Sequence, residues 1–266
     1  MNIVFNGCSF VKGNALRTHH EAGGHENLPW DEKEPLNFTT LLSNKLNAKQ
    51  INIASPGGSN DKIIRTTYEW IKQNPKEVKD SIFVIGLTEI LRSEKFCANT
   101  KTYVKWRYTT FANNARNFKK EALMLLDTKF YEYVKNNYLE DKVLDYAKTD
   151  LLLFSDFENE YKKLNQQLDM LQSYIDNLGG KLIVFAAMLE VNNTYYNRNE
   201  AFTTEGSSLD TTSFNFLSFP KEGCNCWRSY IKSYDDKYHA YDHPAINDQP
   251  VLVDILFNYI NKNFNE

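Results

Sequence analysis

Four apolar runs of strand length, separated by segments with helical spacing, most constrain the fold of this chain. The first three run into or contain a glycine, and the runs comprise residues 3–5, 51–54, 81–87 and 182–187. Between them, residues 37–46 and 63–72 place apolar side chains at helical intervals. Apolar strands that alternate with helices through short glycine turns are typical of a parallel, doubly wound sheet. We therefore predict an α/β fold.

Two segments interrupt this alternation. Residues 96–154 are aromatic-rich and charged, without an obvious strand, and predict a helical insertion near the strand ends. Residues 192–238 are polar and rich in Ser and Thr, as in a lid-like loop. Amphipathic helices are expected at 157–178 and 248–264. A chain of 266 residues fits one large domain, 1–266, that carries both additions.

The charge balance and composition exclude several classes of function. Lys and Arg number 31 against 34 Asp and Glu, so a nucleic-acid partner is not expected. Apolar runs fall short of the roughly 18 residues that a membrane span needs. The first residues do not pair a basic segment with an apolar one, as a signal peptide does. The four cysteines are typical of reduced thiols, so a cytoplasmic location is expected.

A serine and a histidine are the candidates for chemistry. Ser9 follows the first strand, and the carboxyl ends of parallel strands are where such sheets bind ligands. Residues 7–11 depart from the Gly-x-Ser-x-Gly elbow because Val11 replaces the last glycine. A serine needs an adjacent base to act as a nucleophile, and His243, beside Pro244, is the candidate. Singly, Ser9 also fits a helix cap and His243 a surface residue.

Four short motifs in one order change this assessment. They are Gly7-Cys8-Ser9-Phe10, residues 52–60, Gly86-Leu87-Thr88-Glu89 and Asp242-His243-Pro244. Together they resemble the SGNH hydrolases, also called GDSL esterases and lipases. The predicted order of strands and helices resembles this family over nearly the whole chain, whereas the motifs themselves comprise few residues. It implies a flavodoxin-like three-layer α/β/α fold with a parallel sheet.

The resemblance also implies an activity and a set of roles. The expected reaction is hydrolysis of an acyl or acetyl ester of a small alcohol, sugar or lipid, without a cofactor or metal. Ser9 is the implied nucleophile and His243 the implied base, and the N–H groups of Ser9 and Gly57 are the implied oxyanion donors. Three residues within or just after the motifs are assigned to substrate binding: Asn60, Glu89 and Arg92. For Arg92 two roles stay open: binding an anionic substrate group, or pairing with a carboxylate on its own helix.

The chain departs from the family pattern at three positions. Cys8 replaces the acidic residue before the serine, and Thr88 stands where the family has its oxyanion asparagine. We therefore assign the Thr88 hydroxyl to the oxyanion hole as a third donor, shorter than the amide of the family. Ala240 occupies the place of the triad aspartate, so we assign Asp242 to the catalytic group instead. A Ser-His dyad held by a backbone carbonyl remains open. A second register remains open too, because Asp236 and His239 have the Asp-x-x-His spacing.

Two other interpretations compete with a hydrolase. A degenerate relative would keep the fold and bind a ligand or partner without catalysis, and the missing asparagine and aspartate motivate this. A zinc module would use Cys224, Cys226, His239 and His243, although the cysteines are closer together than is usual. A homo-oligomer through aromatic residues of the insertion also remains open.

Overall fold

The central sheet of the computed structural model is parallel throughout. The structure describes residues 1–13, 30–90, 92–107, 127–154, 157–188, 209–222, 224, 226–235 and 243–264. Within these residues the sheet order is β2-β1-β3-β6-β7. The strands are β1 (Asn2–Gly7), β2 (Lys49–Asn52), β3 (Ser81–Leu87), β6 (Lys181–Ala186) and β7 (Phe216–Leu217). The predicted parallel α/β sheet is confirmed.

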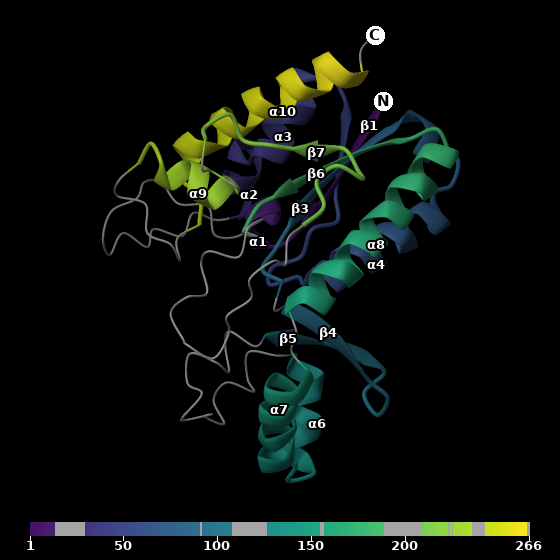
Figure 1. The fold of residues 1–266 in the computed structure, drawn as a ribbon, viewed down its shortest axis with the longest axis vertical. Helices are drawn as coiled ribbons and strands as arrows, with labels where there is room; N and C mark the ends of the chain where they lie inside the picture. Colours follow the sequence, from purple (N-terminus) through teal and green to yellow (C-terminus); the bar gives the residue numbers. More distant parts are fainter. Residues whose placement is uncertain are drawn as a thin grey trace.

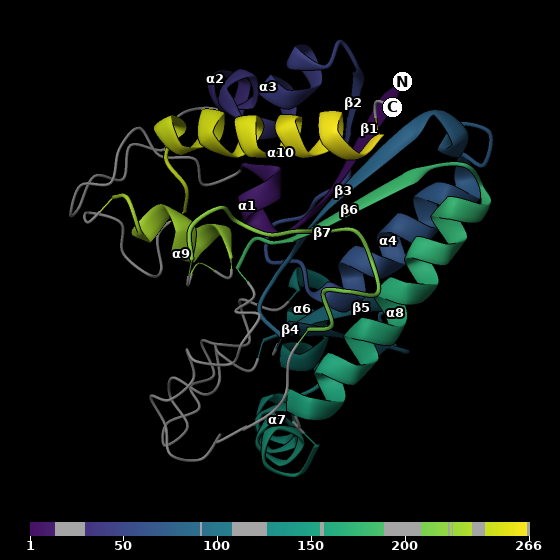
Figure 2. The same cartoon turned by 45° about the horizontal axis from the view of Figure 1, so that its top comes forward.

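Helices cover both faces of this sheet, which makes three layers (Figures 1 and 2). Ile3 and Phe5 belong to a core shared with α3 (Phe38–Lys45) and α10 (Gln249–Phe264). Val4 points to the opposite face, into a core shared with α4 (Asn60–Gln73) and α8 (Phe157–Asn177). Successive residues of a strand alternate between faces, so the apolar residues of β1 and β3 contribute to both cores. The predicted three-layer α/β/α arrangement is confirmed.

The strand order places a topological switch point at the carboxyl ends of β1 and β3. The chain moves from β1 to β2 on one side and then returns to β3 on the other, and ligands bind at such switch points. Gly7 and Gly86 are register partners, so the two strands end level with each other.

The remaining short elements are α1 (Ser9–Lys12), α2 (Trp30–Lys33), α9 (Trp227–Lys232) and the 3₁₀ turns η1 (Glu34–Leu36), η2 (Val78–Asp80) and η4 (Ile246–Asp248).

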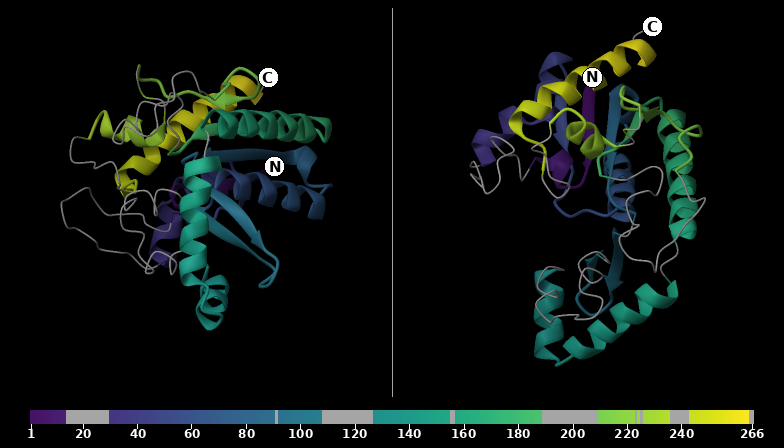
Figure 3. Two further views of the ribbon diagram at one scale, coloured as in Figure 1. Left: turned by 60° about the horizontal axis from the view of Figure 1, so that its bottom comes forward. Right: turned by 60° about the vertical axis from the view of Figure 1, so that its left-hand side comes forward.

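The insertion after β3 begins with strands. β4 (Arg92–Cys97) and β5 (Thr102–Arg107) form an antiparallel hairpin, followed by α6 (Thr128–Asn136) and α7 (Glu140–Phe154). The prediction that this segment lacks a strand is therefore wrong in its first part. Val104 and Trp106 are buried there, whereas Tyr103 and Lys105 beside them are not. Figures 1 and 3 show the insertion on the side of the sheet where β3 ends.

The predicted lid-like loop at 192–238 lies partly outside the described residues. Its described part is not wholly irregular, because it supplies the edge strand β7 and the helix α9. Both elements are short, two and six residues, and so leave little periodicity to detect. None of the helices in the described part of the chain is long and apolar enough to cross a lipid bilayer.

Candidate active site

Ser9 and His243 lie in direct contact at the carboxyl edge of the sheet. Ser9 begins α1, one residue after β1 ends, and its Oγ lies 2.8 Å from His243 Nε2. Both residues are half-buried. The structure therefore brings together the serine and the histidine that the motifs single out, from opposite ends of the chain.

Two glycines allow the short helix behind Ser9 to pack onto the strands. A Cβ on Gly7 would lie 2.3 Å from Val11 Cγ2, and a Cβ on Gly86 would lie 2.5 Å from the same atom. Val11 is fully buried, so its side chain fills the space above both strand ends. The helix stops at Gly13, whose φ of 77° suits glycine. Val11, which breaks the Gly-x-Ser-x-Gly pattern, thus anchors the turn that presents Ser9.

The segment around His243 is held by packing and hydrogen bonds. The ring of Phe10 lies 5.1 Å from the imidazole, centroid to centroid. Two residues on, the Ala245 N–H donates to Asp248 Oδ2 at 2.6 Å. The Tyr234 hydroxyl donates to Asp248 Oδ1 at 2.9 Å, and burial, with the nearby Asp248 charge, raises the pKa of Tyr234 well above its usual range. Sequence reasoning missed Tyr234 and Asp248, because Ala245 lacks the side-chain acceptor that makes a capping box recognisable in a sequence.

The predicted third member of the triad, Asp242, lies outside the described residues. So do Ala240, His239 and Asp236, which belong to the alternative registers. The assignment of Asp242 as the hydrogen-bond partner of His243 Nδ1 therefore stays a prediction.

The turn that carries Gly57 packs against the chain just before Ser9. The Gly58 N–H donates to Ser55 O at 2.9 Å, which closes the turn, and the Ser55 N–H donates to Gly7 O at 3.0 Å. A Cβ on Gly58 would approach that same Gly7 oxygen to 3.4 Å. The Gly57 backbone therefore lies close to the link between β1 and α1, as its predicted oxyanion role requires.

Thr88 and Asn60 are bonded to each other. Asn60 Nδ2 donates to Thr88 O at 3.0 Å, and the Thr88 N–H donates to Asn60 Oδ1 at 2.9 Å. Thr88 is fully buried, and its hydroxyl faces Met188 Sδ at 3.9 Å. Asn60 thus holds the N-terminus of α4 against the end of β3. Its predicted contact with substrate, and the predicted oxyanion contact of Thr88, both stay predictions.

Glu89 is shared by two arginines. Arg92 Nε lies 2.8 Å from Glu89 Oε2, and Arg228 Nη1 lies 3.6 Å from Glu89 Oε1. Arg228 comes from α9 and also donates to Met188 O at 3.2 Å. All three charged side chains are largely buried. Of the two roles expected for Arg92, the structure shows the pairing with a carboxylate, that of Glu89. Sequence reasoning missed Arg228 because α9 is remote in the chain.

Two of the four residues proposed as zinc ligands, Cys226 and His243, make other contacts in the structure. Cys226 is buried and its Sγ accepts from the Ser229 N–H at 3.4 Å, capping α9. His243 Nε2 is in contact with Ser9. Over the described ranges, groups of three or more His, Cys, Asp or Glu side chains with the geometry of a metal site do not occur. A site with Cys226 and His243 would require both residues to leave these contacts.

Comparisons with known proteins find only distant likenesses. Protein-family models do not match the chain, and curated proteins do not match it either. Among solved structures, a psychrotrophic esterase from Pseudoalteromonas sp. is similar at 13% identity, over 100% of this chain and 99% of the other, with a TM-score of 0.48. A carbohydrate esterase family 2 enzyme with a carbohydrate binding domain, from Corynascus thermopiles (Myceliophthora fergusii), has 11% identity over 100% and 67%, with a TM-score of 0.48. An α/β hydrolase from the metagenome of Lake Arreo, Spain, has 10% identity over 97% and 94%, with a TM-score of 0.43. These likenesses are too distant to assign a family or an activity.

Proposed function

We propose that this chain is a serine hydrolase that cleaves an ester, with Ser9 as nucleophile and His243 as general base. The observation that supports this most is the 2.8 Å contact between Ser9 Oγ and His243 Nε2 at the carboxyl edge of a parallel sheet. A serine and its base within hydrogen-bond reach are the minimal unit of nucleophilic acyl transfer. The expected substrate is an acyl or acetyl ester of a small alcohol, sugar or lipid.

In the proposed reaction, Ser9 Oγ attacks the acyl carbon while its proton passes to His243 Nε2. The imidazolium then gives this proton to the leaving alkoxide, and an acyl-serine ester forms. Water then attacks this ester while His243 accepts its proton, and the imidazolium gives that proton to Ser9 Oγ as the bond between Oγ and the acyl carbon breaks, which releases the acid and restores the serine. This sequence needs side chains of the protein and water, and calls for no cofactor.

The oxyanion of each tetrahedral intermediate would be stabilised by the N–H groups of Ser9 and Gly57. Ser9 is the first residue of α1, where an N–H has no acceptor within the helix. Thr88 is a weaker candidate because its hydroxyl is buried against Met188. Loss of one oxyanion donor costs about 10²–10³ in rate in other hydrolases. A slow enzyme is therefore consistent with this site.

A fluorophosphonate probe tests the proposal because it reacts with activated serines. We expect covalent labelling of the peptide that contains Ser9, detected by mass spectrometry, and loss of labelling in Ser9→Ala. Ser213→Ala, which removes an exposed serine elsewhere, should label like the wild type.

A folded wild-type protein that resists the probe and does not hydrolyse a panel of short acyl esters would contradict a hydrolase. It would favour the alternative of a degenerate relative that binds a ligand or partner, which the burial of Thr88 in place of the family's asparagine supports.

A further inference from the structure

The turn at residues 55–58 has a geometry that fixes the direction of the Gly57 N–H. Gly58 N donates to Ser55 O, and Gly57 has a φ of 66°. Proline at the second position with a left-handed residue at the third defines a type II turn. Type I and type II turns differ by a flip of the central peptide, which here is the Pro56–Gly57 unit. The direction of the Gly57 N–H therefore depends on which turn type is kept.

A lysine of the insertion binds the other side of this same peptide. Lys105 Nζ donates to Pro56 O at 2.9 Å. In a trans peptide the C=O and the N–H point in opposite directions. A cation that holds the Pro56 carbonyl therefore also sets the direction in which the Gly57 N–H points. It polarises the peptide as well, which makes the N–H a stronger donor.

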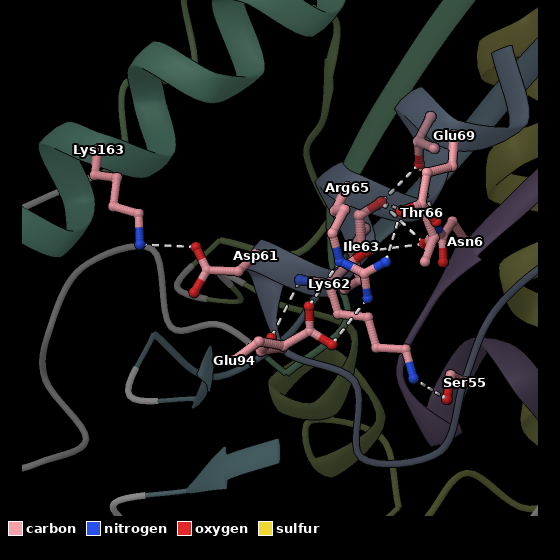
Figure 4. Close-up of polar contacts among 12 residues, drawn as sticks. Asn6, Ser55, Asp61, Lys62, Ile63, Arg65, Thr66, Glu69, Glu94 and Lys163 are labelled. Carbon is pink, nitrogen blue, oxygen red and sulfur yellow. Dashed lines mark hydrogen bonds and ion pairs between the residues drawn. The ribbon is translucent and has the colours of Figure 1, made fainter. Parts of the chain in front are cut away.

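The hairpin that carries Lys105 is fixed to α4. Arg65 makes two hydrogen bonds to Glu94 of β4, at 3.0 and 3.1 Å, which Figure 4 shows. Its guanidinium also lies 4.0 Å from the ring centre of Tyr103 of β5. Tyr103 and Lys105 are two residues apart on one strand and so lie on the same face. The Arg65 contacts therefore hold the face of β5 that carries Lys105.

A second lysine binds the same turn from α4. Lys62 Nζ donates to Ser55 Oγ at 2.8 Å, and Figure 4 shows this side chain extended toward Ser55. Burial lowers the pKa of Lys62, although nearby Glu94 opposes this shift. The Lys62 contact is to a side chain and leaves the central peptide unconstrained, so the two lysines have different consequences for Gly57.

We propose that Lys105 is a positioning residue: by binding Pro56 O it holds the Gly57 N–H in the orientation that stabilises the oxyanion. This rests on the proposed function of the site. It assigns the insertion a part in the reaction that the motifs around Ser9 do not reveal. Because the oxyanion forms after substrate has bound, the contact should affect kcat more than KM.

The test compares Lys105→Met with Lys105→Arg and with Lys101→Met, which removes an exposed lysine of the same hairpin. Measured on a short acyl ester, kcat of Lys105→Met should fall about 10- to 100-fold, a part of the cost of losing an oxyanion donor outright. KM should change little, Lys105→Arg should restore much of the rate, and Lys101→Met should match the wild type. Wild-type kcat in Lys105→Met, or a change in KM alone, would overturn the proposal.

A second readout does not depend on catalysis. In ¹⁵N-labelled protein, the amide resonance of Gly57 should shift in Lys105→Met and stay in place in Lys101→Met. An unmoved Gly57 resonance in Lys105→Met would overturn the inference even in an active enzyme. A shifted resonance in a protein that hydrolyses nothing would contradict the proposed function and leave the Lys105 contact standing.

Discussion

Gly7 of β1 and Gly86 of β3 are register partners, and one side chain, that of Val11, occupies the space above both. This relationship determines how α1 follows β1, because any Cβ at either glycine would meet Val11 Cγ2 at 2.5 Å or less. Two motifs that are far apart in the sequence are thus coupled through one apolar residue. The glycine of the third motif therefore has a packing role, distinct from the backbone donation expected of Gly57.

A double-mutant cycle on Gly7 and Val11 tests this coupling. Gly7→Ala should lower the free energy of unfolding by about 1–3 kcal/mol, the usual cost of overpacking a core. In a Val11→Ala background the same change should cost less, because the atom at 2.3 Å is gone. Urea unfolding measures both values. An equal cost in both backgrounds would instead assign the cost to the two contacts that Val11→Ala keeps, Val11 Cβ at 2.8 Å and Gly86 O at 3.0 Å from the same Cβ.

His243→Gln should slow fluorophosphonate labelling of Ser9 by about 10²–10⁴, the range typical of a lost general base. Combining it with Ser9→Ala should lower ester hydrolysis no further than Ser9→Ala alone, since residues that act as a unit are not additive. Mass spectrometry of samples quenched at successive times gives the rate of labelling, and thermal unfolding checks that the variant is folded. Unchanged labelling in His243→Gln, with a loss in His239→Gln, would transfer the role of base to the alternative register.

Asn60→Ala should destabilise the protein by about 1–3 kcal/mol. The substitution leaves the buried Thr88 N–H and C=O without the partners that Asn60 supplies at 2.9 and 3.0 Å. Asn263→Ala is the control, because Asn263 is exposed and donates to Tyr259 O within its own helix, α10. If Asn60 instead binds substrate, Asn60→Ala will raise KM and leave the urea midpoint near that of the wild type.

The central sheet was predictable because its core strands are short, continuous apolar runs. Residues 81–87 form β3 with the bounds expected, and every one of them is buried. The hairpin was missed because β4 is half-buried and mainly polar, so it resembles the charged helices that follow it. The order of the motifs was enough to predict that Ser9 and His243 belong to one site. The contacts of Arg228 with Glu89 and of Lys105 with Pro56 join residues far apart in the chain, and a single sequence does not record such pairings.

Glu160 provides a prediction about pH, since it shares Lys163 of α8 with Asp61 of α4. Lys163 Nζ lies 2.7 Å from Asp61 Oδ1, a pair drawn in Figure 4, and 3.6 Å from Glu160 Oε2. Burial raises the pKa of Glu160 above its ordinary value of 4.5, and the charge of Asp61 adds to this, although Lys163 opposes it. The folded protein therefore keeps this proton to a higher pH than the unfolded chain does.

The sign of the effect on stability follows from that difference. As the pH rises from about 4.5, the unfolded chain loses the proton first, so the contribution of Glu160 to the free energy of unfolding declines. Glu160→Gln does not titrate, so its urea midpoint relative to the wild type should increase between about pH 4.5 and neutrality. Glu158→Gln removes an exposed carboxylate from the same helix and serves as the control. A midpoint difference for Glu160→Gln that stays constant with pH, or that moves in favour of the wild type, would mean that the attraction of Lys163 outweighs burial at this site.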